Sequence, residues 1–261
     1  MIDKSVGFIG GGRVTRIILT SLKRAGKMLA DVVVGDINNE VLEKLKDEFP
    51  EITVMPNDNT APAEKDIVLL AVHPPVMPTV LNEIKAFLKP TTYLISLAPK
   101  FTIQSILNTI KCFPRIVRMI PNANSFVNNG YNPIAFSETV SEAERQKLVD
   151  FLSCLGECPM VPEEKLEAYA VITGMGPTYF WFQLNELKKI AQGFGLTEPE
   201  AENGVTKMVA GSIKTLFNSG LTPEQVMDLI PVRPLQDHEQ QIKDAYHSKL
   251  EPLYKRLKGI A

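Results

Sequence analysis

The chain has 261 residues, of which 44% are hydrophobic and 22% charged, and its formal net charge is −2. This length and composition allow one large globular domain or two modest ones. Lys and Arg are spread along the chain, which argues against a nucleic-acid or polybasic membrane partner, and no apolar run approaches the roughly 20 residues that span a bilayer.

The cysteines indicate a reducing environment. Cys112, Cys154 and Cys158 are too few and too irregularly spaced for a disulfide framework. Cys154 and Cys158 stand four residues apart with no histidine nearby, so the sequence predicts no metal site. The first residues lack the apolar segment of a signal peptide. We therefore expect a cytoplasmic protein.

Short β-branched runs alternate with helical patterns over residues 1–161. The run from Asp66 to Val72 is apolar on both faces, which is typical of a central parallel strand. This alternation predicts βαβ units and a doubly wound parallel sheet, that is, an α/β dinucleotide-binding Rossmann domain. We expect strands over 5–10, 31–36, 66–72, 92–98 and 115–121, and helices over 13–26, 40–48, 79–88 and 102–110.

The remaining residues, 162–261, read as a C-terminal all-α domain. Several of its helices are apolar over a wide arc, as in the run from Tyr179 to Phe182, and about 100 residues cannot bury such surface alone. We therefore expect these helices to form a homodimer or higher homo-oligomer. The predicted helices cover 163–173, 176–194, 197–219, 222–230 and 236–258.

A glycine-rich turn follows the first predicted strand. Gly10, Gly12 and Thr15 occupy the three positions of G-x-G-x-x-G/A, a turn that lets a pyrophosphate approach the backbone. The helix that follows offers unpaired N–H groups and the positive end of its dipole to phosphates. A dinucleotide site is thus predicted, and Thr15 in place of a smaller residue predicts slightly looser packing of helix on strand.

Asp36 ends the second predicted strand, 26 residues beyond Gly10. A carboxylate there accepts hydrogen bonds from a ribose 2′-OH and repels a 2′-phosphate, so NAD is favoured over NADP. Arg13 lies within the turn and leaves NADP open, because its guanidinium can reach a phosphate.

The carboxyl ends of the other strands supply further candidates, because open α/β sheets bind ligands there. His73 follows a buried strand and is either a general acid or a residue packed beside the nicotinamide ribose. The Pro-Asn turn in 118–130 and the Gly-rich helix opening in 173–180 are candidates to converge on the nicotinamide, or are merely turns. The expected cofactor contacts are Gly10, Gly11, Gly12, Arg13, Val14, Asp36, Asn59, Ala71, Val72, His73, Pro74 and Ala98.

Taken in order, these stretches resemble the pyrroline-5-carboxylate reductase family. The resemblance runs from "GFIGGG" through "LLAVHPP", "LISLAPKFTI", "RMIPNANSFVNNG" and "ITGMGPTYF" to "GSIKTLFNSGLTPEQVMDLI", which is nearly the full chain. It implies a Rossmann domain, a helical domain that dimerises by interlocking helices, and reduction of a cyclic imine to proline with NAD(P)H.

The departures from the family pattern gather on the substrate side. Where the family reads Ser-Pro-Gly-Gly-Thr-Thr, this chain has "PVRPLQD", Pro231 to Asp237, and Arg233 is the expected substitute for binding a carboxylate. The family's Ala-Ala-Gly is Ala98-Pro99-Lys100, and its Ser-Gly-Ser-Gly loses a hydroxyl at Met175. A helix glutamate aligns with Asn185, and a lysine with His73.

Imine reduction makes modest demands on side chains, because a protonated imine carbon is already electrophilic. We expect Thr173 to be the catalytic residue that orients the substrate nitrogen. The expected substrate contacts are Asn122, Gly174, Gly176, Thr178 and Arg233.

Two alternatives stay open. The first is an NAD(P)-dependent dehydrogenase on the same scaffold that acts on another imino, oxo or hydroxy acid. The 3-hydroxy-acid dehydrogenases place a catalytic lysine early on the corresponding helix, whereas Lys188 comes about three turns in. The second alternative is a non-catalytic NAD(H)-binding sensor.

Overall fold

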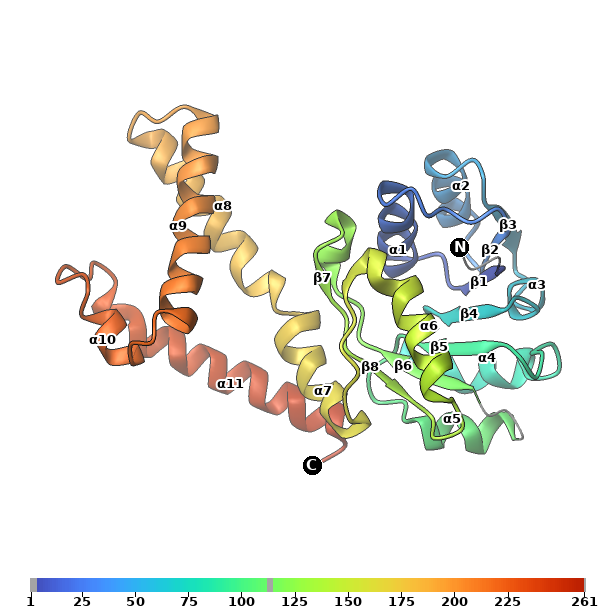
Figure 1. The fold of residues 1–261 in the computed structure, drawn as a ribbon. Coiled ribbons are helices and arrows are strands. Elements are labelled where there is room, and N and C mark those ends of the chain that lie inside the picture. Colours follow the sequence, from blue (N-terminus) through green and yellow to red (C-terminus); the bar gives the residue numbers. More distant parts are fainter. Residues whose placement is uncertain (1–3, 112–114, 261) are drawn as a thin grey trace. The chain divides into compact units, whose positions relative to one another are not determined.

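The computed structural model describes residues 4–111 and 115–260, so Cys112 lies outside the described ranges. Its residues group into two compact units. The sheet unit comprises the described residues up to Met175 and those from Leu253 onward, and the helical unit comprises Gly176–Pro252 (Figure 1). The predicted domains, 1–161 and 162–261, stay a prediction, because spatial grouping does not define where an independently folding domain ends.

A seven-stranded sheet forms the centre of the sheet unit, in the order β3-β2-β1-β4-β5-β6-β8. All neighbouring pairs are parallel except β6 and β8, which pair in antiparallel fashion. The five predicted strands and the parallel doubly wound sheet are confirmed, whereas β3 and β8 were not predicted. The strands are β1 (Val6–Ile9), β2 (Val32–Asp36), β3 (Thr53–Pro56), β4 (Ile67–Leu70), β5 (Tyr93–Ser96), β6 (Ile116–Met119) and β8 (Ile134–Phe136).

Helices cover both faces of this sheet (Figure 1). Successive residues of a strand point to opposite faces, so that Leu69 packs in the core beneath α1, α2 and α6, while Leu70 packs in the core beneath α4 and α5. The two apolar layers hold the carboxyl ends of β1, β4, β5 and β6 in place. The helices are α1 (Arg13–Arg24), α2 (Asn39–Glu48), α3 (Thr60–Ala63), α4 (Met77–Ile84), α5 (Ile103–Ile110) and α6 (Glu142–Leu152).

The chain leaves the sheet through a segment with three kinds of helical turn. The continuous helix predicted over 163–173 is instead η4 (Glu163–Lys165), α7 (Leu166–Tyr169) and the π-turn η5 (Ala170–Gly174). The N–H of Met175 bonds to the carbonyl of Ala170, five residues earlier. Single π-turns of this kind occur often at functional sites. Beside the sheet, β7 (Gly130–Tyr131) pairs with β9 (Gly156–Glu157).

The helical unit leaves most of its apolar side chains exposed. Of residues 176–252, all of which the structure describes, only Gly176 and Ala201 are buried. Phe182 is 68% exposed and Phe217 75% exposed, as expected of a surface that another subunit covers. Its helices are α8 (Pro177–Gly193), α9 (Glu198–Asn218), α10 (Pro223–Met227) and the greater part of α11 (Glu239–Lys258). Within the described ranges, no helix combines the length and apolarity needed to cross a membrane.

Candidate active site

The glycine turn between β1 and α1 depends on Gly10. Its φ is +100°, a conformation that other residues rarely adopt. A Cβ at this position would lie 2.6 Å from the carbonyl oxygen of Ala71, at the end of β4. Gly10 also donates its N–H to the carbonyl of Gly35 at 2.8 Å. Only glycine therefore allows the ends of β1, β2 and β4 to approach so closely.

Thr15 has a structural role in the glycine turn, and the slightly looser packing of α1 on the sheet expected from its size stays a prediction. The side chain is fully buried, and its hydroxyl donates to the carbonyl oxygen of Gly10 at 2.5 Å. This bond satisfies a buried carbonyl of the turn and thereby fixes its shape.

The N-terminus of α1 is arranged to receive an anion. Gly12 is the N-cap residue, it offers no side-chain hydrogen bond, and the first turn of the helix contains no acidic residue. A Cβ at Gly12 would meet nothing within 4 Å, so the space in front of the helix is open. The first N–H groups of a helix have no partner within it, and the helix dipole favours negative charge. A pyrophosphate fits this end of α1.

Asp36 ends β2 beside the same turn. One carboxylate oxygen accepts the N–H of Gly11 at 2.6 Å, and the other accepts the N–H of Asn38 at 2.8 Å. The carboxylate is therefore held in one orientation and still has lone pairs to offer. The next residue, Ile37, is 81% exposed.

A cavity of about 720 Å³, here called the turn cavity, opens beside the glycine turn. It combines backbone from the turn with three basic side chains and His73. Arg16 is paired with Glu48 at 2.6 Å, so part of this positive charge is already neutralised. The residues that line the turn cavity are Gly11, Gly12, Arg13, Arg16, Val41, Lys44, Leu45, Glu48 and His73.

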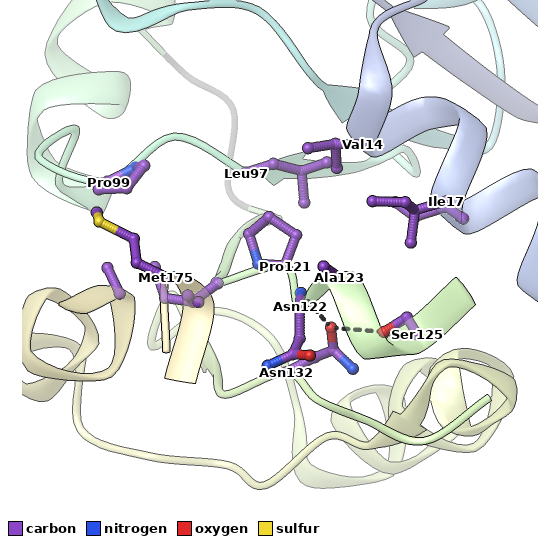
Figure 2. Close-up of a pocket in the computed structure, with 14 residues that line it drawn as sticks. Val14, Ile17, Leu97, Pro99, Pro121, Asn122, Ala123, Ser125, Asn132 and Met175 are labelled. Carbon is purple, nitrogen blue, oxygen red and sulfur yellow. Dashed lines mark hydrogen bonds between the residues drawn. The ribbon is translucent and has the colours of Figure 1, made fainter. Parts of the chain in front are cut away.

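A second cavity, of about 310 Å³ and here called the apolar cavity, lies next to the start of α1 (Figure 2). Most of its wall is hydrocarbon, and its polar groups come from the loop after β6. It suits a flat ring with few polar atoms. The apolar cavity is lined by Val14, Ile17, Ile18, Leu97, Pro99, Ile120, Pro121, Asn122, Ala123, Ser125, Asn132, Ala170, Gly174 and Met175.

Asn122 joins two walls of the apolar cavity. Its side-chain amide donates to the carbonyl of Thr173 at 2.8 Å. Its backbone N–H donates to the side-chain oxygen of Asn132 at 2.9 Å (Figure 2). The Thr173 hydroxyl donates to the carbonyl of Tyr169 at 2.9 Å. That bond uses the hydroxyl proton and leaves the oxygen as an acceptor, next to Gly174, which lines the apolar cavity.

The other predicted cofactor contacts lie at the carboxyl ends of the strands. Asn59 caps α3 and donates to Glu83 at 3.0 Å. Pro74 begins a short 3₁₀ turn after His73. Ala98 packs its side chain in the core beneath α4 and α5, so only its backbone can face a ligand. Ala71 and Val72 are half-buried at the end of β4.

Three predicted substrate contacts, Gly176, Thr178 and Arg233, belong to the helical unit. The side chain of Arg233 forms an ion pair with Glu239. Gly176 is the N-cap residue of α8, and Thr178 is exposed in its first turn.

Several cavity residues were missed at the sequence level. Leu97 and Pro99 follow β5, and Ile17 lies one turn into α1. No local signal marks them, because an aliphatic side chain that faces a ligand has the same pattern as one that faces the core.

The described thiols have no marks of a metal or redox site. Cys154 and Cys158 are free and buried. Burial raises the pKa of the Cys158 thiol to about 12, and burial also raises the pKa of Cys154. Among the described residues, no group of three or more His, Cys, Asp or Glu side chains could hold a metal ion.

Two family descriptions match the chain, one in each half. "NADP oxidoreductase coenzyme F420-dependent" matches residues 5–100, and "Pyrroline-5-carboxylate reductase dimerisation" matches residues 163–232. Together they cover the glycine turn, the strands that surround it, and the helices with exposed apolar side chains.

Curated relatives extend the similarity across both parts. Pyrroline-5-carboxylate reductase 1 of Bacillus spizizenii is 26% identical over 231 residues, which is 87% of this chain and 77% of the relative. The pyrroline-5-carboxylate reductase of Escherichia coli is 24% identical over 230 residues, which is 88% of this chain and 85% of the relative.

Solved structures share the fold over the full length. A pyrroline-5-carboxylate reductase from Coxiella burnetii is 26% identical with a TM-score of 0.70, and the match covers 98% of this chain and 95% of that one. The pyrroline carboxylate reductase of Plasmodium falciparum, solved with NADP bound, has a TM-score of 0.83 at 21% identity. The match covers 100% of this chain and 99% of that one.

Proposed function

Because the chain belongs to the pyrroline-5-carboxylate reductase family, we propose that it reduces the cyclic imine pyrroline-5-carboxylate to proline with NAD(P)H. This is the last step of proline biosynthesis. The observation that carries the proposal is the open N-terminus of α1, which adjoins an apolar cavity lined by Val14 of the same helix. We further propose that the protein acts in the cytoplasm.

The pyrophosphate of the dinucleotide binds the backbone N–H groups of Gly12, Arg13 and Val14. The residues around Asp36 and the turn cavity would hold the adenosine, and the apolar cavity between Val14 and Leu97 would hold the nicotinamide ring. When bound, the dinucleotide supplies the hydride. The hydrocarbon wall of the cavity excludes water from the transfer.

NADH is the favoured cofactor. The fixed carboxylate of Asp36 accepts hydrogen bonds from ribose hydroxyls and repels a 2′-phosphate, and Arg16 is already paired with Glu48. The test is the ratio of kcat/KM for NADH to that for NADPH in the wild type and in Asp36→Ser. The substitution should move this ratio toward NADPH by about tenfold or more, since repulsion of a charge is worth about 1.4 kcal/mol or more.

Asp31→Ser is the matched control for Asp36→Ser. Asp31 precedes β2, at the strand end away from the glycine turn, and its side chain pairs with Lys65 on the surface. The control should leave the ratio unchanged. A wild type that prefers NADPH, with no change in Asp36→Ser, would remove the role proposed for Asp36.

Thr173 orients the substrate nitrogen. Its hydroxyl proton is committed to the carbonyl of Tyr169, so its oxygen accepts the N–H of the protonated imine. The iminium carbon then accepts the hydride, and the C=N electron pair becomes the lone pair of the product amine. Thr173→Val should lower kcat/KM by about tenfold or more, because it removes the acceptor and keeps the shape. Thr173→Ser, which keeps the hydroxyl, should retain most of the activity.

Arg233 binds the substrate carboxylate. In the structure its guanidinium pairs with Glu239, so the substrate carboxylate must displace a side chain of like charge. Arg233→Ala should raise KM for the imine, whereas Glu239→Gln should lower it, because the competing charge is gone. An unchanged KM in both variants would exclude this role.

The altered segment Pro231–Asp237 supports one other function, reduction of a different imino or oxo acid on the same scaffold. Assays with a panel of cyclic imines, oxo acids and hydroxy acids, monitored by nicotinamide absorbance at 340 nm, distinguish this function from reduction of pyrroline-5-carboxylate. Binding of NADH without turnover of any member would instead indicate a sensor. For assembly, we propose a homodimer in which the exposed apolar faces of α8 and α9 bind a second copy of the chain.

A further inference from the structure

Arg118 is a buried charged side chain on the strand next to the β8 edge of the sheet. It belongs to β6 and is 1% exposed. Its two terminal nitrogens bind two carboxylates, Glu163 at 2.8 Å and Glu167 at 2.6 Å, both from the segment that follows the sheet. Burying such charges is costly, and replacing a buried ion cluster with apolar residues is often neutral or stabilising. Stability alone therefore does not explain this cluster.

The same two carboxylates also hold the backbone of a third segment. Glu163 accepts the N–H of Ile103, at the start of α5, at 2.7 Å. Glu167 accepts the N–H of Lys100 at 3.3 Å, and Lys100 has a φ of +79° that is unfavourable for a residue with a side chain. The loop after β5 is thus held in an unfavourable conformation by a carboxylate that Arg118 holds in place.

Each of the three joined segments continues into a wall of the apolar cavity. The loop after β5 contributes Pro99, β6 leads into Pro121, and α7 leads into Gly174. The contact between Asn122 and the carbonyl of Thr173 closes the last two walls on each other. The guanidinium therefore links all three segments through its ion pairs with Glu163 and Glu167 and through the backbone hydrogen bonds that these carboxylates accept.

We propose that Arg118, acting through Glu163 and Glu167, is a positioning residue that sets the width of the apolar cavity and the place of Thr173. Its kinetic consequence rests on the proposed function, because the cavity holds nicotinamide and imine in that account. Arg118 touches neither. A shift of about 1 Å between reacting groups can lower a rate by about 100-fold.

The test combines an apolar replacement with a conservative one. Arg118→Met/Glu163→Met/Glu167→Met removes these three charges together. Lys258, whose ammonium lies 4.0 Å from Glu167, keeps its bond to the carbonyl of Glu164, so the Tm should stay close to that of the wild type. We expect kcat/KM for pyrroline-5-carboxylate to fall by about 100-fold, while the Kd for NADH changes less than about threefold, because the pyrophosphate site is untouched. Arg118→Lys keeps the positive charge but cannot bind both carboxylates with two separate nitrogens. Its kcat/KM should therefore fall by about tenfold.

Hydrogen exchange gives a readout that does not depend on the reaction. Segments 97–103 and 166–175 should exchange faster in the triple variant, whereas the peptide carrying the glycine turn should not change. Arg145→Met is the control, because Arg145 pairs with Glu142 at 3.9 Å and donates to the carbonyls of Val140 and Ser137, none of which lines the apolar cavity. It should match the wild type in both measurements.

Folded variants with wild-type kcat/KM and wild-type exchange would overturn the proposal, as would an equal loss in Arg145→Met. If the triple variant fails to fold, Arg118→Lys and Glu163→Gln decide the question by the same two readouts. A wild type that does not reduce pyrroline-5-carboxylate would refute the proposed function alone, because the exchange measurements would still decide whether Arg118 positions the cavity.

Discussion

The sheet unit buries most of its apolar side chains, whereas the helical unit leaves most of its apolar side chains exposed. In the sheet unit, aliphatic residues of β1, β4 and β5 are almost fully buried between helices of the same chain. In the helical unit, Trp181 is 50% exposed and Phe182 68% exposed, although both lie in the middle of a regular helix. The sheet unit thus completes its core by itself, and the helical unit has the composition of a core without a partner to cover it.

The difference separates two kinds of information in the sequence. Apolar residues that recur with the period of a strand specify a sheet that the same chain covers. Apolar residues all around a helix specify a surface that the chain leaves open, and hence an assembly. The following variants test this contrast, in order of decreasing expected effect.

The largest effect is expected from charging the exposed apolar face. Phe182→Glu with Ile213→Glu places carboxylates on α8 and α9, where each large side chain is worth about 2 kcal/mol when buried. The variant should elute as a monomer in size-exclusion chromatography with light scattering. Met160→Glu, on an exposed residue of the sheet unit, is the control and should keep the oligomer. An unchanged oligomer in the double variant would refute the role of this face.

A large loss of stability is expected from Gly10→Ala in the sheet unit. The added Cβ meets the carbonyl of Ala71 and strains a φ of +100°, so the free energy of unfolding should fall by about 3 kcal/mol. Urea denaturation measures this. Gly12→Ala has open space around it and should unfold like the wild type, yet bind NADH about tenfold more weakly. Equal destabilisation by both substitutions would contradict this account of the turn.

A smaller effect is expected from Thr15→Val, which keeps the shape of a buried side chain and removes its hydroxyl. The carbonyl of Gly10 then loses a partner, at a cost of about 1–2 kcal/mol in the free energy of unfolding. Thr15→Ser keeps the hydroxyl and serves as the comparison. If the Thr15→Val variant is as stable as the wild type, this hydrogen bond contributes nothing to the stability of the turn.

The smallest effect at neutral pH is expected at Cys158. Burial raises the pKa of its thiol to about 12, so the unfolded chain loses this proton at lower pH than the folded one. The contribution of this neutral thiol to the free energy of unfolding is therefore complete below the ordinary thiol pKa of about 9. It is lost as the pH rises from about 9 to about 12, by up to about 1.4 kcal/mol per pH unit. Cys158→Ala should flatten the alkaline decline in stability. An identical decline would contradict the assignment.

Much of the fold could be predicted, because parallel strands that are buried on both faces stand out as short apolar runs. The strand β3 was missed because Thr53 and Pro56 are exposed, and β8 because three residues show no periodicity. The segment after residue 162 was predicted as one helix, since the sequence pattern does not distinguish a π-turn from an α-helix.

The candidate site also has one part that the sequence predicts and another that it does not. The glycine turn and Asp36 are local, so their spacing alone predicts a dinucleotide site. The apolar cavity is assembled from distant segments. The Pro-Asn turn at Pro121 was a candidate, whereas Leu97 and Ile17 give no sign of facing a ligand. Arg118 did offer a signal, a charge within an otherwise apolar strand, but its partners lie 45 and 49 residues away.

The most direct test of the central claim follows the hydride itself. The protein is incubated with pyrroline-5-carboxylate and NADH carrying deuterium at one of the two C4 positions, and the proline formed is weighed by mass spectrometry. We predict proline heavier by one mass unit from one C4 epimer and unlabelled proline from the other. Consumption of neither epimer, with no proline formed, would contradict the account.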